Sequence, residues 1–132
     1  PEEAHELRRY TDPAGIDFIS LIAPTTDDER IKKVVSQAQG FLYYISVTGV
    51  TGTKKPQIAD IKKDVARIRR FSKLPVAVGF GISTPRQAGE IAAHADGVVV
   101  GSAFVRLIDE NREGDDLVSL VAGYATEIKK SL

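Results

Sequence analysis

The sequence predicts an α/β fold in which parallel β-strands alternate with α-helices, and three observations lead to this prediction. Short apolar, β-rich runs recur at spacings of roughly 22 to 33 residues. Amphipathic or charged segments of helical length lie between these runs. The last two runs each lead into a glycine turn followed by a residue that can cap a helix. Regular alternation of this kind is typical of a parallel sheet with right-handed crossovers.

The chain is expected to begin with a helix and to continue into a strand. Residues 1–9 read as a helix because a proline stands at its start, glutamates follow, and arginines come later. Residues 11–15, Thr-Asp-Pro-Ala-Gly, then interrupt the chain. Residues 16–23 are mostly apolar and β-rich, as expected for a strand that is buried on both faces.

A second helix, strand and loop follow. Thr25 or Thr26 can cap a helix that runs to about residue 39, with acidic residues early and lysines later. Residues 41–47 form the next predicted strand. Residues 48–56 contain three glycine or proline positions and almost nothing that could be buried, so they are expected to form a loop.

Two more helix and strand pairs complete the predicted series. A charged amphipathic helix is expected at 58–71 and a strand at 74–78. Ser83 or Thr84, followed by Pro85, begins a helix that reaches about residue 94. The remaining elements are a strand, a short helix and a final helix, at 98–100, 104–110 and 115–130.

The composition excludes several classes of function. The 132 residues carry 18 basic and 18 acidic side chains, and this balance argues against general nucleic-acid or membrane-surface binding. There is no cysteine, so a disulfide framework or thiolate metal site is impossible. We therefore expect residues 1–132 to form a single domain of a cytoplasmic protein. The chain also lacks methionine, which is compatible with a piece of a longer protein or a processed product.

The glycine turns make a phosphorylated small molecule the first ligand to consider. Residues 78–83 and 98–103 each run from strand to glycine to helix start. Glycine allows close approach of the backbone, and the N–H groups of a new helix favour an anion. Two such turns on the last two strands match the phosphate site of (β/α)8 barrels. The alternative is that the glycines only form tight turns.

Four strands are too few to close an eight-stranded barrel. The predicted fold is therefore half of a (β/α)8 TIM barrel, with about four parallel strands and flanking helices. Such a half barrel exposes apolar inner side chains and two strand edges. A missing N-terminal half, a second copy or a partner chain is expected to cover them.

Four segments resemble the C-terminal half of the tryptophan synthase alpha subunit, in that family's order and spacing. They are Leu-Ile-Ala-Pro-Thr-Thr at 21–26, Tyr-Tyr-Ile-Ser-Val-Thr-Gly-Val-Thr-Gly at 43–52, Gly-Phe-Gly-Ile-Ser at 79–83 and Val-Gly-Ser-Ala at 100–103. The resemblance implies a lyase that cleaves indole-3-glycerol phosphate to indole and glyceraldehyde 3-phosphate. It also implies a beta-subunit partner that carries pyridoxal phosphate, in an αββα complex, and no cofactor in this chain.

The resemblance also implies residue roles. Gly52, Gly81, Gly101 and Ser102 match phosphate contacts, and Leu21, Tyr43 and Phe80 match residues that line the indole pocket. Thr51 matches a lid threonine that orients a catalytic aspartate, and Tyr43 is expected to support catalysis with it. The family's two catalytic carboxylates match no position in this sequence. The other interpretations are a plain surface loop for Thr51 and plain barrel core for the pocket residues.

Other candidate sites are weak. His5 and His94 lie away from the motifs, and the acidic residues 27–29 are ordinary for a first helical turn, so no metal site is predicted. Two functions stay open at this point. The chain is either part of an alpha-type lyase, or a half barrel that binds phosphate without catalysis and self-associates. A different phosphate-binding barrel lyase or isomerase fits the Thr-Gly-Val-Thr-Gly segment poorly.

Overall fold

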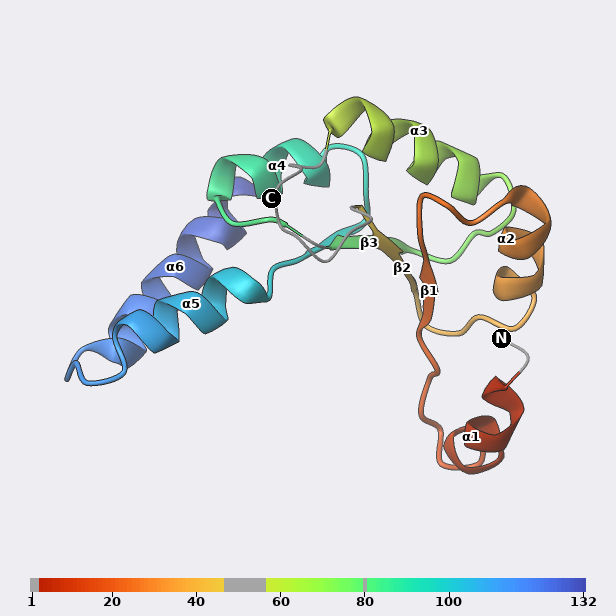
Figure 1. Ribbon diagram of the computed structural model, residues 1–132, viewed down its shortest axis with the longest axis horizontal. Helices are drawn as coiled ribbons and strands as arrows, with labels where there is room; N and C mark the ends of the chain where they lie inside the picture. The colour runs from red at the N-terminus through yellow and green to blue at the C-terminus, as the bar shows by residue number, and fades with distance from the viewer. Residues whose placement is uncertain (1–2, 47–56, 80) are drawn as a thin grey trace.

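The elements of the fold follow the predicted alternation of helix and strand (Figure 1). The computed structural model describes residues 3–46, 57–79 and 81–132. Within them the order is α1 (Ala4–Thr11), β1 (Ser20–Ile22), α2 (Asp28–Val35), β2 (Leu42–Ile45), α3 (Ile58–Arg69), β3 (Val76–Gly79), α4 (Pro85–Ala92), β4 (Gly97–Val99), α5 (Ser102–Glu110) and α6 (Leu117–Ser131).

The four strands form one parallel sheet in the order β1-β2-β3-β4, as predicted. Each strand pairs with the next one along the chain, so every connection is a crossover that carries at least one helix. The predicted arrangement of about four parallel strands with flanking helices is confirmed. Among the described residues β1 and β4 are the outer strands, and each has only one strand neighbour.

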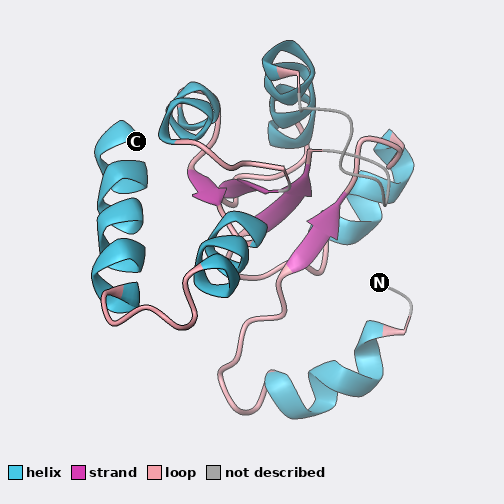
Figure 2. Ribbon diagram, turned by 60° about the vertical axis from the view of Figure 1, so that its left-hand side comes forward, coloured by secondary structure: helices cyan, strands magenta, loops and turns pink. Residues whose placement is uncertain are grey.

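One face of the sheet is covered by helices and carries the hydrophobic core. Ile22, Tyr44 and Val78 are aligned across three strands and are almost fully buried. They pack with apolar residues of α2, α3 and α4 in one continuous cluster that also includes Ile128 of α6. Figure 2 shows these helices arranged in an arc around the strands. Burial of this cluster is the main source of stability, because apolar area removed from water contributes most to folding.

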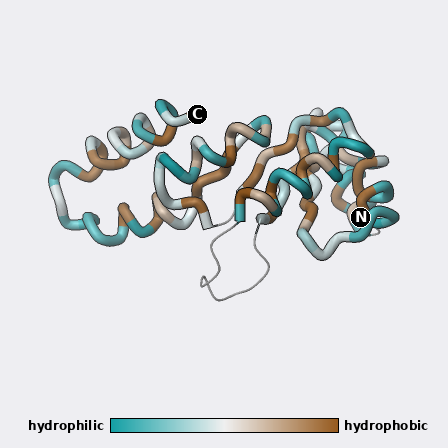
Figure 3. Tube along the Cα trace, turned by 90° about the horizontal axis from the view of Figure 1, so that it is seen from above, coloured by the Kyte–Doolittle hydropathy of each residue, from teal (hydrophilic) through white to brown (hydrophobic). Residues whose placement is uncertain are grey.

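The opposite face of the sheet, called the inner face below, carries side chains that lie outside this core cluster. It consists of two aligned rows, because side chains alternate along each strand. The rows are Leu21, Tyr43, Ala77 and Gly97, and then Ile45, Gly79 and Val99. None of the five hydrophobic side chains in these rows belongs to the core cluster. Along the chain, hydrophobic stretches alternate with hydrophilic ones (Figure 3).

The helix start after β1 differs in detail from the prediction. Asp27, not Thr25 or Thr26, caps α2, and its side chain accepts a hydrogen bond from the Arg30 N–H at 2.7 Å. The Thr26 hydroxyl instead accepts from the Ala23 N–H at 3.1 Å, which stabilises the preceding turn. β1 is also shorter than the predicted strand at 16–23.

Helices α4, α5 and α6 pack together at one end of the sheet, where α5 and α6 lie side by side (Figure 1). Gly89 of α4 allows close packing with α6, because a Cβ there would lie 2.5 Å from the Ser131 carbonyl oxygen. Thr84 caps α4 by accepting from the Gln87 N–H at 3.2 Å, as predicted for Ser83 or Thr84. This packing holds α6 against the segments that follow β3 and β4.

Candidate functional site

Gly81 and Gly101 lie at the same edge of the sheet. Gly79 and Val99 are paired neighbours at the ends of β3 and β4. Each glycine follows its paired residue by two positions, so both lie just beyond the carboxyl ends of adjacent parallel strands. Gly81 has a positive φ of 75°. Residues that carry a Cβ rarely adopt this backbone conformation, so the turn after β3 requires glycine. The two predicted phosphate turns are therefore neighbours in the fold.

Gly101 and Ser102 start helix α5. The Phe104 and Val105 N–H groups both donate to the Gly101 carbonyl oxygen, at 2.9 and 3.2 Å. The N–H groups that precede them have no carbonyl partner earlier in the helix, as in the first turn of any helix. Gly101 and Ser102 are exposed, and open space surrounds the position of a Cβ on Gly101. An anion can therefore approach this helix start and its Ser102 hydroxyl.

The turn after β3 is more fully occupied by the protein's own groups. The Ser83 N–H donates to the Gln87 side-chain oxygen at 3.1 Å, and Thr84 caps α4 as described above. The Ser83 and Gln87 N–H groups at the start of α4 are therefore already hydrogen-bonded to side chains. Gly81, which lies before this capped start and is exposed, is the part of the turn that a ligand can approach.

Tyr43 lies on the inner face and contacts the end of β3. A Cβ placed on Gly79 would overlap the hydroxyl and Cζ of Tyr43. The backbone of Gly79 is also fixed by the residue that follows β2, because its carbonyl oxygen accepts from the Ser46 N–H at 3.0 Å and from the Ser46 hydroxyl at 2.9 Å. Tyr43 and Ser46 thus hold the residue from which the Gly81 turn departs.

Leu21 lies beside Tyr43 on the inner face, in register with it across β1 and β2. Its side chain is 59% exposed, because β1 is an outer strand of the described sheet. Two of the predicted pocket residues, Leu21 and Tyr43, are therefore neighbours. The third, Phe80, lies outside the described residues, as do Thr51 and Gly52.

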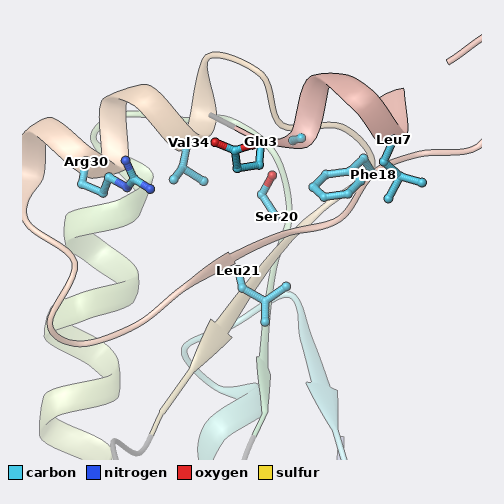
Figure 4. A pocket seen from close by; sticks show the side chains of 8 residues that line it. Glu3, Leu7, Phe18, Ser20, Leu21, Arg30 and Val34 are labelled. Carbon is cyan, nitrogen blue, oxygen red and sulfur yellow. The ribbon is translucent and has the colours of Figure 1, made fainter. Parts of the chain in front are cut away.

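An apolar hollow of about 470 Å³ lies along β1, between α1 and α2. Figure 4 shows Leu7, Phe18 and Leu21 around it, with Ser20 at its centre and Arg30 at one side. Leu7 and Leu21 are both more than half exposed. An exposed strand with apolar neighbours is a surface that further polypeptide can cover.

Neither metal binding nor a membrane span is indicated within the described ranges. Residues 3–46, 57–79 and 81–132 contain no group of three or more His, Cys, Asp or Glu side chains arranged to hold a metal ion. None of the helices in those ranges combines the length and apolar character that crossing a membrane requires. The acidic residues at the start of α2 serve the helix cap and its ion pairs instead.

A family model described as "Tryptophan synthase alpha chain" matches residues 1–131. The chain belongs to this family. Tryptophan synthase alpha chains of Citrifermentans bemidjiense and Geotalea uraniireducens are 48% identical over 132 residues and 50% identical over 129 residues. These alignments cover 100% and 98% of this chain but only 49% and 48% of the relatives. The chain thus spans about half the length of the curated relatives it matches.

Solved structures of tryptophan synthase alpha chains share this fold. The subunit from Legionella pneumophila strain Paris superposes with a TM-score of 0.83 at 33% identity, over 99% of this chain and 48% of that one. A Mycobacterium tuberculosis tryptophan synthase structure gives a TM-score of 0.83 at 34% identity, over the same shares of the two chains. The four strands therefore correspond to part of a larger fold in both structures.

Three residues around the turns were not identified from the sequence as contributors. They are Gly79, Ser46 and Tyr124 of α6, whose hydroxyl donates to the Ser83 carbonyl oxygen at 3.1 Å. Gly79 carried a usable signal in the sequence, because glycine inside a strand often marks a close approach by another group. Ser46 and Tyr124 carried none, since their contacts join segments that are distant in sequence.

Proposed function

We propose that this chain supplies the phosphate- and indole-binding side of a tryptophan synthase alpha-type lyase. The reaction is cleavage of indole-3-glycerol phosphate to indole and glyceraldehyde 3-phosphate. The observation that carries the proposal is the pair of glycine turns at the same edge of β3 and β4, in a chain of this family. Residues 1–132 act as one domain in this proposal, and the continuous core from β1 to α6 supports that.

The phosphate group is held by Gly81, Gly101 and Ser102. Backbone N–H groups at Gly81 and at the start of α5 donate to phosphate oxygens, and the Ser102 hydroxyl adds another donor. Gly52, which lies outside the described residues, is assigned to the same site through the family resemblance. The resulting contacts are remote from the reacting bond and provide binding energy that positions it.

The indole ring lies against the inner face. Leu21 and Tyr43 form an aliphatic and an aromatic wall, and their neighbours Ala77 and Gly97 are small enough to leave room above the sheet. Phe80 completes the pocket in this assignment. An apolar wall suits indole because ring stacking and dispersion contacts replace contacts with water.

The cleavage is a retro-aldol reaction that requires an acid and a base. A carboxylic acid protonates the indole carbon at the bond that breaks while a carboxylate takes the proton from the indole N–H, which gives the indolenine tautomer. The hydroxyl of the adjoining glycerol carbon then gives its proton to the first carboxyl group and becomes the aldehyde, as the C–C bond breaks and its electron pair moves into the ring. The ring nitrogen takes its proton back from the second carboxyl group. Each such proton transfer contributes on the order of 100- to 10,000-fold. Neither carboxylate matches a position in this sequence, so we propose that these 132 residues alone are inactive. Thr51 orients one carboxylate in the complete site, and Tyr43 supports that arrangement.

The partners follow from the same assignment. An N-terminal half barrel covers the inner face and the hollow along β1, and a beta subunit with pyridoxal phosphate receives the indole in an αββα complex in the cytoplasm. A second candidate function is a non-catalytic half barrel that binds phosphate and self-associates. The 59% exposure of Leu21 and the apolar hollow beside it fit that alternative as well, because a second copy can also cover them.

The lyase proposal is tested by supplying the missing half. The N-terminal half of the Citrifermentans bemidjiense alpha chain, up to the residue before the aligned segment, is refolded together with this chain. Indole release from indole-3-glycerol phosphate is then measured. We expect release from the mixture, none from either part alone, and a slower rate with Thr51→Val. A stable, correctly sized complex that releases no indole would contradict the proposal, and a stable dimer of this chain that excludes the added half would favour the alternative.

A further inference from the structure

Tyr124 of α6 contacts both of the segments that follow β3 and β4. Its hydroxyl donates to the Ser83 carbonyl oxygen at 3.1 Å. Its ring packs edge-on against Phe104 of α5, with 4.8 Å between the ring centroids and 64° between the ring planes. One side chain therefore touches the turn that contains Gly81 and the helix that starts at Gly101.

The contact with Ser83 fixes the Gly81 turn from one side. Ser83 is two residues beyond Gly81, and its N–H is already bound to the side chain of Gln87 on α4 at 3.1 Å. With Tyr124 on the carbonyl, both backbone polar groups of Ser83 are engaged. The two peptides on either side of Ser83, which begin one residue beyond the positive-φ Gly81, are thus restrained in orientation.

The contact with Phe104 fixes the start of α5. Phe104 is in the first turn of that helix, where its N–H donates to the Gly101 carbonyl oxygen at 2.9 Å. A restrained Phe104 ring limits rotation of this first turn. The direction in which the N–H groups of Ser102 and Ala103 point depends on that rotation.

Helix α6 is a firm base for Tyr124. The helix packs on α4 at Gly89, where only glycine fits against the Ser131 carbonyl, and on α5 through the ring pair. Tyr124 is half-buried against the core cluster, and burial raises the pKa of its hydroxyl, so the hydroxyl remains a hydrogen-bond donor at neutral pH.

We propose that Tyr124 is a positioning residue that fixes the two phosphate-binding turns relative to each other. The inference rests on the proposed phosphate site at Gly81, Gly101 and Ser102. Tyr124 does not touch the ligand in this account; it acts through Ser83 and Phe104. Losing either contact should weaken phosphate binding, even in a chain that remains folded.

The test is the affinity of the full 132-residue chain for inorganic phosphate, measured by calorimetry well below the unfolding temperature. Tyr124→Phe removes the hydroxyl and keeps the ring, and Phe104→Leu removes the ring pair and keeps the hydroxyl. We expect each variant to bind phosphate about 2- to 10-fold more weakly, the range that one hydrogen bond or ring contact provides. Tyr10→Phe is the matched control, because Tyr10 is 75% exposed on α1.

Amide NMR signals give a second readout that a purely structural role would not change in the same pattern. Without phosphate, Tyr124→Phe should shift the signals of Ile82 and Ser83, and Phe104→Leu those of Ser102 and Ala103. Phosphate binding that is equal in Tyr124→Phe, Phe104→Leu and the control would overturn the inference and leave the phosphate site intact. Failure of the unmodified chain to bind phosphate would overturn the proposed site, and the inference with it.

Discussion

The Tyr43 hydroxyl occupies the space that a Cβ on Gly79 would need. The two residues lie on neighbouring strands of the inner face, with Tyr43 paired to Ala77 and Gly79 one step further along the same face of β3. The Gly79 backbone cannot retreat easily, because its carbonyl oxygen is bound twice by Ser46. Gly79 therefore matters as a space for the tyrosine rather than as a turn.

Replacing Gly79 by alanine should destabilise the chain because the new methyl group displaces the Tyr43 ring. Overpacking of this kind costs about 1–3 kcal/mol. The penalty should shrink when Tyr43→Leu is present, so the two changes are expected to be coupled in urea unfolding. Gly123→Ala on α6 is the control; open space surrounds a Cβ there, and alanine should stabilise the helix. Equal penalties for Gly79→Ala with tyrosine and with leucine at position 43 would contradict the contact.

Ser102→Ala should weaken binding of glyceraldehyde 3-phosphate without lowering thermal stability. Ser102 is exposed at the start of α5, so the change removes a donor to the ligand and little packing. A hydrogen bond to a charged group is worth about 1.5–3 kcal/mol, which corresponds to roughly 10- to 150-fold in affinity. Ser119→Ala, at an exposed position of α6, is the control. Unchanged affinity in Ser102→Ala would remove this hydroxyl from the site.

Tyr44 anchors β2 to α3 through a hydrogen bond that its hydroxyl donates to the Asp64 carboxylate at 2.5 Å. Tyr44→Phe should cost about 1–3 kcal/mol in the free energy of unfolding, because the buried bond to a charged group is lost. Asp64 keeps Arg67, 3.6 Å away, as an ionic neighbour. A loss no larger than that of Tyr10→Phe in the same urea titration would show that this bond does not stabilise the fold.

The same hydrogen bond predicts that the stability of the fold falls at alkaline pH. Burial, and then the Asp64 hydrogen bond, raise the pKa of Tyr44 well above its ordinary value of 10.0. A raised folded pKa means that the stabilising contribution is complete below pH 10.0 and is lost as the pH rises above it. The unmodified chain should therefore lose stability above pH 10.0 more steeply than Tyr44→Phe. Parallel curves of unfolding free energy against pH would contradict this origin.

The contacts of Asp96 predict that the stability of the fold falls at acid pH. The Val76 N–H and then the Arg69 guanidinium, both 2.9 Å from one carboxylate oxygen, lower the pKa of Asp96 below its ordinary value of 3.8. The contribution is present above pH 3.8 and is lost as the pH falls through the lower folded pKa. Asp96→Asn should flatten the acid limb of the stability curve, and Asp115→Asn, at an exposed position, should not. The contribution of Asp96 to the free energy of unfolding is modest because its side chain is half-exposed and screened by solvent.

The sequence was sufficient to predict the sheet and the location of the two turns, because both depend on local signals. Apolar runs at regular spacing identify the strands, and glycine followed by a capping residue identifies Gly81 and Gly101. The contacts that support the turns could not be predicted in this way. Tyr124 and Ser83 are 41 residues apart, and Ser46 and Gly79 are 33 apart, so only the folded chain brings them together. The α2 cap shows the same limit, since Asp27 and Thr26 are both good caps and the local turn decides between them.

The phosphate site is tested most directly by an amide NMR titration of this chain with glyceraldehyde 3-phosphate, with unphosphorylated glyceraldehyde as the control. We expect saturable shifts that are largest at Gly81, Gly101 and Ser102, and none of that pattern with glyceraldehyde. Shifts that avoid these three residues, or that appear equally without the phosphate group, would contradict the claim that the two turns form a phosphate site.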